Sequence, residues 1–435
     1  MNGRLNWFRA GFVGAGIFLA GIACATAAMA DASGSPQIPE QKVRFAHAPY
    51  IDTSAAFIGM QKGWFKDVGI VIEDETLFTP IENTASFISS GSADVVDSGL
   101  VQILPSLNTI SNVRVFTQHD IFQGQAIMGQ SKYKTVDSFI SQGMNLQDAI
   151  RAAVAQMKGK TLLLAPDPAS SNFARVFLGA GGLSISDVTV INADYRQHLP
   201  LMLAGRADFE NGGGPTIIQM LKNGFSQVIQ TKHLIQQVDP AKDISPLTSI
   251  VVNGYVASTD YIKNNYPTIL RIASVNYRIA DYIANNPKEA AAIQAPFLNR
   301  YGGSQLTTDD VTLLYTQIDP FFGFDAQSEW YHNENSPYFW KHWAQAVINS
   351  SEQQGVIPKG QWTPETIELS HQVYKDLEGY RDDARSLIDQ HSADLEAKGG
   401  KAAEFLAAAK RNFDIFNYYD ADQFAKHAVA ISQGG

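Results

Sequence analysis

Cysteine is almost missing from this sequence, which narrows the chemistry open to the chain. Cys24 is the only cysteine among 435 residues, and it lies close to the N-terminus. Beyond it the chain can form no disulfide and offers no thiol nucleophile or thiolate metal ligand. His332, Glu334 and His342 lack the spacing of a metal-binding motif. We therefore expect neither a metal nor a cofactor.

Basic runs and long apolar runs are also missing. Lysine and arginine number 33 against 43 acidic residues, giving a net charge of -10 without a basic stripe. This pattern argues against a nucleic-acid partner. Beyond the N-terminal segment, no stretch approaches the length of a membrane-spanning helix. With 45% hydrophobic and 17% charged residues, the chain is globular, and its length suits two domains.

The N-terminal segment has the pattern of an export signal. Arg4 and Arg9 precede an apolar run at residues 11–23, and Ala28-Met29-Ala30 provides a small-residue cleavage site. The pattern predicts a signal peptide at residues 1–30, cleaved after Ala30. We therefore expect export to the periplasm by the general secretory route, because there is no twin-arginine pair.

A lipid anchor on Cys24 is the alternative to cleavage after Ala30. Lipoprotein signals usually have leucine three residues before the modified cysteine, whereas this sequence has Gly21. Cleavage after Ala30 is therefore favoured. Residues 31–41 follow as a small, polar, proline-containing leader that we expect to be flexible.

Residues 43–96 establish the fold class, because strand and helix patterns alternate in them. The expected strands lie near residues 43–45, 70–72 and 94–96, and the expected helices near 55–62 and 82–90. This order predicts βαβ units and a parallel sheet. Asp52, Thr53 or Ser54 is expected to cap the first of these helices.

The same rhythm returns later in the chain. A second alternation of strands and helices begins with a strand expected at residues 161–164. The segment SGSAD at residues 90–94 has a counterpart, AGRAD, at residues 204–208. Two similar α/β lobes predict a clamshell with a cleft between them. The β-rich stretches at residues 126–129 and 250–254 are expected to be two crossovers that form a two-strand hinge.

Three pieces of the first lobe carry a family resemblance: the opening strand with its proline-containing loop, QKGWFKDVGIVIE at residues 61–73, and SGSADVVDSG at residues 90–99. In order and spacing they resemble the periplasmic substrate-binding proteins of ABC importers, in the nitrate/sulfonate/taurine group, over about residues 42–301. The resemblance implies a type II periplasmic-binding clamshell of two lobes, each a mostly parallel sheet with flanking helices. The expected division is a signal peptide (1–30), leader (31–41), lobe 1 (42–128), lobe 2 (129–249), and a return to lobe 1 with a helical C-terminal extension (250–435).

The resemblance also implies a function. The chain would be a monomeric receptor that captures a small anionic or zwitterionic organic solute and delivers it to a membrane permease, with no bond made or broken. The receptor of a non-ABC transporter, or a sensor, is an alternative that the residues do not separate. An enzyme like the thiamine-pyrimidine synthases, which share the fold, is disfavoured because their cysteine-rich motif and metal histidine are missing.

Ligands of open α/β sheets bind beyond the carboxyl ends of the strands. From the loops expected there, the candidate ligand-binding residues are Tyr50, Asp52, Thr53, Thr79, Gly99, Gln123, Ser170, Ser171, Asn172, Asn211, Gly212 and Gly213. The strongest case is residues 170–172, expected to open a helix whose N–H groups suit an anion, although ordinary capping also explains them. The glycines after Asn211 allow close backbone approach, or a flexible turn. Asp52 would repel an anion unless it pairs with a cation, so it also suits a zwitterion with an amine.

The C-terminal part is expected to be mainly helical, with separate helices near residues 364–380, 384–397 and 401–413. Residues 381–411 are rich in charge and predict a solvated face. Residues 321–343 are dense in aromatic rings. We favour core packing for these rings over a wall for an organic ligand or a docking patch.

Overall fold

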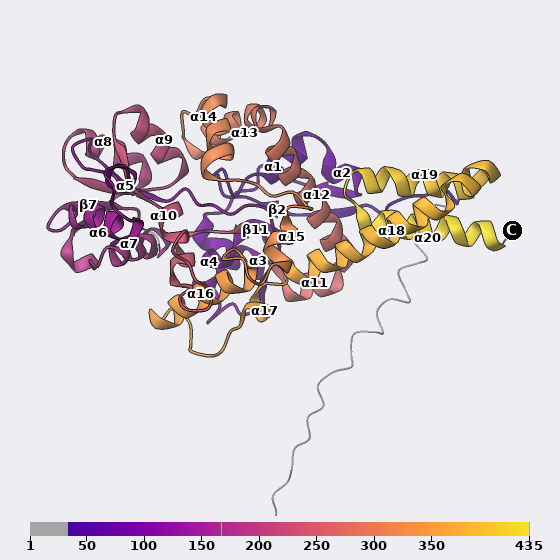
Figure 1. The fold of residues 1–435 in the computed structure, drawn as a ribbon. Coiled ribbons are helices and arrows are strands. Elements are labelled where there is room, and N and C mark those ends of the chain that lie inside the picture. Colours follow the sequence, from indigo (N-terminus) through magenta and orange to yellow (C-terminus); the bar gives the residue numbers. More distant parts are fainter. Residues whose placement is uncertain (1–33, 167, 435) are drawn as a thin grey trace, which may run out of the picture.

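The computed structural model describes residues 34–166 and 168–434. The expected signal peptide, its cleavage site after Ala30 and Cys24 lie outside these residues. Figure 1 shows two α/β lobes next to each other, and long helices extending away from one of them. None of the helices within the described ranges combines the length and low polarity needed to cross a membrane.

The first lobe is built on a four-stranded sheet with the order β2-β4-β11-β5. Its strands are β2 (Phe45–Ala46), β4 (Val95–Gly99), β5 (Val113–Gln118) and β11 (Asn253–Ser258). β2 is parallel to β4, whereas β11 is antiparallel to both β4 and β5. Three strands therefore share a direction and β11 alone is reversed. A separate parallel pair, β1 (Gln41–Val43) with β3 (Ile70–Ile72), lies at the start of the lobe.

The second lobe is built on a five-stranded sheet with the order β10-β6-β9-β7-β8. Its strands are β6 (Ala126–Gly129), β7 (Thr161–Leu164), β8 (Thr189–Asn192), β9 (Phe209–Gly212) and β10 (Ser226–Gln230). β7 is parallel to β8 and β9, and β6 is antiparallel to β9 and β10. Again one strand is reversed. Each reversed strand follows a crossover, so the mostly parallel clamshell expected from the sequence is confirmed.

The chain crosses between the two sheets twice, and a third segment that was not expected lies along the first crossover. Residues 119–125 lead from β5 into β6, and Phe122 pairs with Val251 of the returning segment. The third segment, residues 318–322, lies along the first. The amide of Gln123 donates to the carbonyl of Ile318, and the amide of Phe322 donates to that of His119. The position of this segment could not be predicted from local pattern, because its hydrogen bonds go to residues about 200 positions away.

Short helices connect the strands of the first lobe. They are α1 (Ala56–Gln61), α2 (Trp64–Asp67), η3 (Ile81–Asn83), α3 (Thr84–Ser89), α4 (Leu100–Ile103) and η4 (Leu104–Ser106). The expected capping of α1 is wrong, because its N-cap is Ala55 and no side chain caps it. The hydroxyl of Thr53 instead donates to the carbonyl of Ala48, and that of Ser54 to the carbonyl of Tyr50. These bonds stiffen the loop before the helix.

The second lobe has longer helices around its sheet. They are α5 (Val136–Ser141), α6 (Leu146–Ala155), α7 (Pro168–Ala180), η5 (Ile185–Asp187), α8 (Tyr195–Leu203), α9 (Gly214–Lys222), α10 (Thr231–Ile235) and η6 (Ser245–Ser249). The strand β10 was not expected. Its residues become a strand because they pair with β6, which the local pattern does not reveal.

The repeated segment SGSAD/AGRAD has the same structural role in both lobes. Asp94 accepts a hydrogen bond from the amide of Arg44 at 2.9 Å, and Asp208 accepts one from the amide of Thr161 at 3.3 Å. In each case the aspartate enters a central strand and holds the start of its neighbour. The glycine three residues earlier has positive φ, +72° at Gly91 and +65° at Gly205, which favours glycine at this stop.

Helices fill the chain after β11. They are α11 (Thr259–Asn264), α12 (Tyr266–Asn285), α13 (Pro287–Gly302), α14 (Thr308–Leu313), the π-helix η7 (Leu314–Ile318), α15 (Gln327–His332), α16 (Trp340–Gln353), α17 (Pro364–Ile367), α18 (Ser370–Lys398), α19 (Gly400–Asp414) and α20 (Tyr418–Gly434). The expected break near residue 381 is wrong. Residues 370–398 form one helix that runs through Gly379, because a single glycine costs only about 1 kcal/mol in a helix and the residues after it favour helix. In Figure 1, α18, α19 and α20 form the extension on the right.

Most of the aromatic cluster packs in the core, as favoured from the sequence. Phe321, Phe324, Trp330, Tyr331, Phe339, Trp340 and Trp343 are all buried. Phe322 and Tyr338 are half-buried. These two, together with Trp330, line a cavity, and a ligand wall at these rings stays a prediction.

Candidate ligand-binding site

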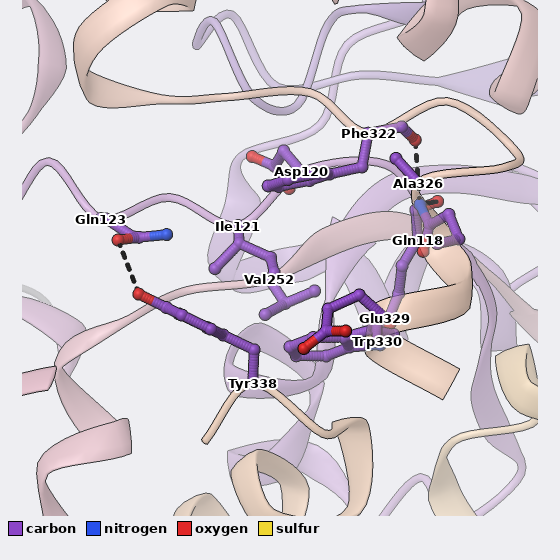
Figure 2. Close-up of a pocket in the computed structure, with 11 residues that line it drawn as sticks. Gln118, Asp120, Ile121, Gln123, Val252, Phe322, Ala326, Glu329, Trp330 and Tyr338 are labelled. Carbon is purple, nitrogen blue, oxygen red and sulfur yellow. Dashed lines mark hydrogen bonds between the residues drawn. The ribbon is translucent and has the colours of Figure 1, made fainter. Parts of the chain in front are cut away.

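A cavity of about 280 Å³ lies against the segments that join the lobes. Its walls come from the end of β5, both crossovers, and the stretch through α15; the lining residues are Gln118, Asp120, Ile121, Gln123, Val252, Phe322, Ala326, Gln327, Glu329, Trp330 and Tyr338. Figure 2 shows Tyr338 on the opposite side of the cavity from Asp120, with its hydroxyl bonded to Gln123. That hydroxyl donates to Oε1 of Gln123 at 3.1 Å. The walls are mainly apolar, with carboxyl groups at Asp120 and Glu329.

Four aspartates converge beside this cavity, and we call them the aspartate cluster: Asp52, Asp97, Asp120 and Asp319. They come from the loop after β2, from β4, from the first crossover and from the residue after η7. Asp97, Asp120 and Asp319 are at most 1% exposed, whereas Asp52 keeps some exposed surface. Asp52 is therefore the member of the cluster that solvent reaches.

The π-helix η7 helps to position Asp319. The amide of Asp319 donates to the carbonyl of Leu314, five residues earlier, at 2.8 Å. Such wide turns are frequent at functional sites, because the extra residue redirects the chain. Here the chain emerges from the turn directly into segment 318–322, and Asp319 faces Asp120.

Asn253, at the start of β11, holds two members of the cluster together. Its side-chain amide lies 3.0 Å from Oδ2 of Asp52 and 3.3 Å from Oδ2 of Asp120. Its backbone amide donates to Oδ1 of Asp120 at 2.8 Å. One residue of the returning strand thus ties the first-lobe loop to the crossover.

His119 is the basic group among these acids. Its Nε2 lies 2.9 Å from the carbonyl oxygen of Asp52, and its Nδ1 lies 2.9 Å from Oδ1 of Asn276. The carboxyl oxygens of Asp97 and Asp120 are 3.8 and 3.9 Å from Nε2. Burial lowers the pKa of His119, and the two hydrogen bonds oppose that effect. Even a protonated His119 offsets one of four carboxyl groups.

Burial raises the pKa of every carboxyl group in the aspartate cluster, and repulsion by neighbouring carboxylates adds to this for Asp52, Asp97 and Asp319. Burial, and then the charge of Asp120, raises the pKa of Asp52 to about 7. Burial raises the pKa of Asp120 to about 6 despite its hydrogen bonds with Asp319 and Asn253. The pKa values of Asp97 and Asp319 rise well above the ordinary range for the same reason. The cluster therefore takes up protons near neutral pH when no cation is present.

Lysine and arginine do not reach the aspartate cluster. Within residues 34–166 and 168–434, none of its members forms an ion pair with either residue type. The same ranges contain no group of three or more histidine, cysteine or acidic side chains arranged to hold a metal ion. His119 is thus the one basic side chain of the described residues that stands against the four acids.

The first-lobe candidates from the sequence have different surroundings. Asp52 belongs to the aspartate cluster and Gln123 lines the cavity. Tyr50 is 45% exposed. Thr53 and Thr79 are buried, and their hydroxyls donate to the carbonyls of Ala48 and Pro80. Gly99 ends β4, where an added Cβ would lie 2.3 Å from the carbonyl oxygen of Val252, so the close strand pairing requires glycine.

The second-lobe candidates are grouped at α7 and at the end of β9. Helix α7 begins at Pro168, so Ser170, Ser171 and Asn172 lie inside its first turns. The sequence had placed these three residues at the opening of the helix. Ser170 is buried, and its hydroxyl oxygen accepts hydrogen bonds from the amide of Ala165 and the side chain of Asn211. Ser171 is half-buried.

The other second-lobe candidates contact neighbouring segments. The side chain of Asn172 donates to the carbonyl of Thr248 and accepts from Gln354 beyond α16. Asn211 and Gly212 are buried at the end of β9, and Gly213 caps α9. An added Cβ at Gly213 would lie 3.0 Å from Nε2 of Gln125, so glycine allows the first crossover to approach closely.

Sequence reasoning missed Asp97, Asp120, Asp319, His119 and Asn253 as ligand-site candidates. Asp97 and Asp120 stand in loops expected at strand ends, so their position and charge were available as a signal. Asp319 and Asn253 gave no such signal, because their place in the site depends on pairing between distant segments.

Comparison with known proteins finds one matching family model and several structures of similar fold. Residues 130–290 match the family model described as NMT1/THI5 like. No curated protein sequence gives a significant match. Among solved structures, a putative periplasmic sulfonate-binding protein from Methylobacillus flagellatus KT is 12% identical, with a TM-score of 0.52 over 79% of this chain and 96% of that one. The periplasmic nitrate-binding protein from Synechocystis PCC 6803 is 13% identical, with a TM-score of 0.53 over 78% and 89%.

A third similar structure is the alkanesulfonate-binding protein from Xanthomonas axonopodis pv. citri bound to MOPS. It is 14% identical and has a TM-score of 0.50 over 74% of this chain and 96% of that one. Identities this low relate the folds alone. Nearly the whole of each relative is covered, so the two lobes correspond. The chain therefore has the two-lobed fold of periplasmic solute-binding proteins, and residues 130–290 form an NMT1/THI5-like segment within it.

Proposed function

We propose that this protein is an exported receptor that captures a small organic solute between its lobes and delivers it to the membrane permease of an ABC importer. The observation that carries the proposal is the convergence of Asp52, Asp97 and Asp120 at the carboxyl ends of the first-lobe strands, next to a cavity at the hinge. Ligands of open α/β sheets bind at this edge. Hinge closure around a ligand is the usual response of periplasmic binding proteins.

Two contacts between the lobes support the proposed closure. Lys222 of α9 forms an ion pair with Asp310 of α14, and Asn172 of α7 is bonded to Gln354 just after α16. In Figure 1, α14 and α16 lie on opposite sides of the region next to the second lobe. Opening the lobes requires both contacts to separate.

Ligand-driven closure tests the receptor proposal. The mature chain is incubated with small metabolites, separated from free solute, and analysed by native mass spectrometry and X-ray scattering. We expect one bound solute per chain and a smaller radius of gyration than in the solute-free protein. Conversion of the bound solute into a product, instead of its release unchanged, would contradict a receptor and favour an enzyme on this fold.

Export is part of the same proposal. Protein recovered from the periplasm should begin at Asp31 and contain no thiol. An N-terminal diacylated Cys24 would replace the soluble receptor by a membrane-anchored one, which intact-mass measurement distinguishes directly. A monomeric state, the charge of the solute and the partner permease are further parts of the proposal, and none follows from the fold.

A further inference from the structure

Buried acceptor oxygens without donors surround the hinge. Neither carboxyl oxygen of Asp97 has a hydrogen-bond partner within normal limits, and the amide of Ala56 is the donor that acts on its pKa. Oδ1 of Asn211 and Oε1 of Gln125 are also buried without a partner. Buried polar groups in folded proteins are normally paired, so such acceptors indicate a missing donor.

The orientation of Asn211 is fixed by its other bonds. Its Nδ2 lies 3.1 Å from the carbonyl oxygen of Ser170, which can only accept. Reversing the amide would place two acceptor oxygens against each other. Oδ1 of Asn211 is therefore an acceptor on the second lobe, as Asp97 is on the first.

The balance of charges in the aspartate cluster also indicates a missing cation. Four carboxyl groups face one histidine, and no lysine or arginine of the described chain pairs with any of them. An anion entering this site would add repulsion, whereas a cation would neutralise buried carboxylates and supply donors. Asp120 lines the cavity, and Asp52, which has exposed surface, is held next to Asp120 by the side-chain amide of Asn253.

We propose that the solute carries an ammonium or amidinium group, which binds Asp52 and Asp120 with Asp97 and Asp319 behind them. This assignment rests on the receptor function proposed above. The apolar part of the solute occupies the cavity between Phe322, Trp330 and Tyr338, whose volume of about 280 Å³ suits one ring or a short chain. The unpaired indole N–H of Trp330 on the cavity wall suits an acceptor at the other end of the molecule. A zwitterion meets these requirements, and a purely anionic solute does not.

A matched set of ligands tests the charge. Benzamidine, benzamide and benzoate have nearly the same shape, and carry a positive, zero and negative charge at pH 7.5. Calorimetry on the dialysed mature chain should show benzamidine binding at least about tenfold more tightly than benzamide, with benzoate weakest. Equal binding of the three, tighter binding of benzoate, or failure of all three to bind would overturn the proposal.

Variants locate the cation. Asp52→Asn should weaken benzamidine binding by about 30-fold or more, as expected when one partner of a buried charge pair is removed. Asp389→Asn, at an exposed position of α18, should leave binding unchanged. Asp120→Asn provides a second test if Asp52→Asn does not fold, which melting curves would show. Unchanged benzamidine affinity in a folded variant of either cluster residue would contradict the assignment.

Solute captured from a metabolite extract separates this inference from the receptor function. A bound compound with a basic nitrogen, lost in Asp52→Asn, supports both. A bound compound without a basic nitrogen overturns the inference and leaves the receptor function standing. If the parent protein enriches no compound, both fail.

Discussion

Asn253 and Asp52 are 201 positions apart in the sequence, yet Nδ2 of Asn253 lies 3.0 Å from Oδ2 of Asp52. The same amide group reaches Asp120. The hydrogen bonds join β11 to the loop after β2 and to the first crossover. The side chain of Asn253 is therefore the neutral donor that makes a site with four buried carboxyl groups compatible with folding.

Replacing Asn253 by alanine removes this donor from both aspartates. A hydrogen bond to a charged group contributes about 1.5–3 kcal/mol, so the free energy of unfolding at pH 7.5 should fall by about that amount. Urea unfolding measures the change. Asn285→Ala, at an exposed helical position, is the control and should change stability by less than about 1 kcal/mol. An equal loss in both variants would show that Asn253 has no special role.

The sequence predicted the parts of this site that depend on local pattern. Strand and helix alternation, together with the SGSAD/AGRAD repeat, predicted two α/β lobes. In both copies of the repeat the aspartate, Asp94 or Asp208, accepts a hydrogen bond from a backbone amide at the start of the neighbouring strand. Asp52 was expected at the site for the same reason, since it follows the first strand of a βαβ unit.

The rest of the site depends on contacts that no local pattern records. Asp319 reaches Asp120 because a π-turn and segment 318–322 lie along the crossover. β4 runs on to Gly99, beyond the expected end of this strand near residue 96, because Asn253–Tyr255 supply its hydrogen bonds. Similarly, Ser170 is buried because α7 begins two residues earlier than its capping residues suggested.

The aspartate cluster should contribute less and less to the stability of the solute-free protein as the pH rises from about 4 to 7. Burial raises the pKa of Asp52 to about 7 and of Asp120 to about 6, and raises those of Asp97 and Asp319 well above the ordinary range, whereas aspartates of the unfolded chain titrate near about 3.9. The folded chain therefore binds more protons than the unfolded chain in this window. The stability that this proton binding contributes is lost as the pH rises through the folded pKa values. His119, whose pKa is lowered, acts in the opposite sense below about pH 6.5.

Asp97→Asn isolates one of these carboxyl groups. Asp97 is fully buried without a hydrogen-bonded partner, so a neutral amide should make the solute-free protein more stable at pH 8 by roughly 1–3 kcal/mol. Because the pKa of Asp97 is raised, its carboxyl takes up a proton more readily as the pH falls, and the difference should be smaller at pH 5. Urea unfolding at both pH values measures it. A constant difference would mean that Asp97 does not titrate in this range.

The ion pair between Lys222 and Asp310 should contribute little to closure. Lys222 is 55% exposed, and exposed pairs contribute about 0–1 kcal/mol. Lys222→Gln should therefore weaken solute binding by at most about fivefold. Competition with the native solute would measure this effect, and scattering would show an unchanged radius in the solute-bound state. A larger loss of affinity would identify this contact as a major latch between the lobes.

The C-terminal extension is attached by a buried ion pair. Arg271 of α12 makes two hydrogen bonds to Asp420 of α20, at 2.8 and 2.9 Å, and both side chains are at most 6% exposed. Asp420→Ala leaves an unpaired buried guanidinium and should cost about 3–5 kcal/mol. Lys410→Ala breaks the exposed pair with Glu396 and should cost less than about 1 kcal/mol. Chemical unfolding compares the two variants, and similar losses would contradict the assigned role of Asp420.

The two serines at the start of α7 should separate stability from binding. The hydroxyl oxygen of Ser170 accepts the amide of Ala165 at 3.1 Å inside the core, so Ser170→Ala leaves that amide unpaired and should cost about 1–3 kcal/mol of stability. Ser171 is half-buried, and Ser171→Ala should change stability by less than about 1 kcal/mol.

If α7 holds one end of the solute, Ser171→Ala alone should weaken binding, by about tenfold for one hydrogen bond to a charged group. Melting temperature and affinity measured on both variants decide the matter. Unchanged affinity in Ser171→Ala would remove α7 from the site and leave the segment around Asn211 and Gly213 as the second-lobe contact.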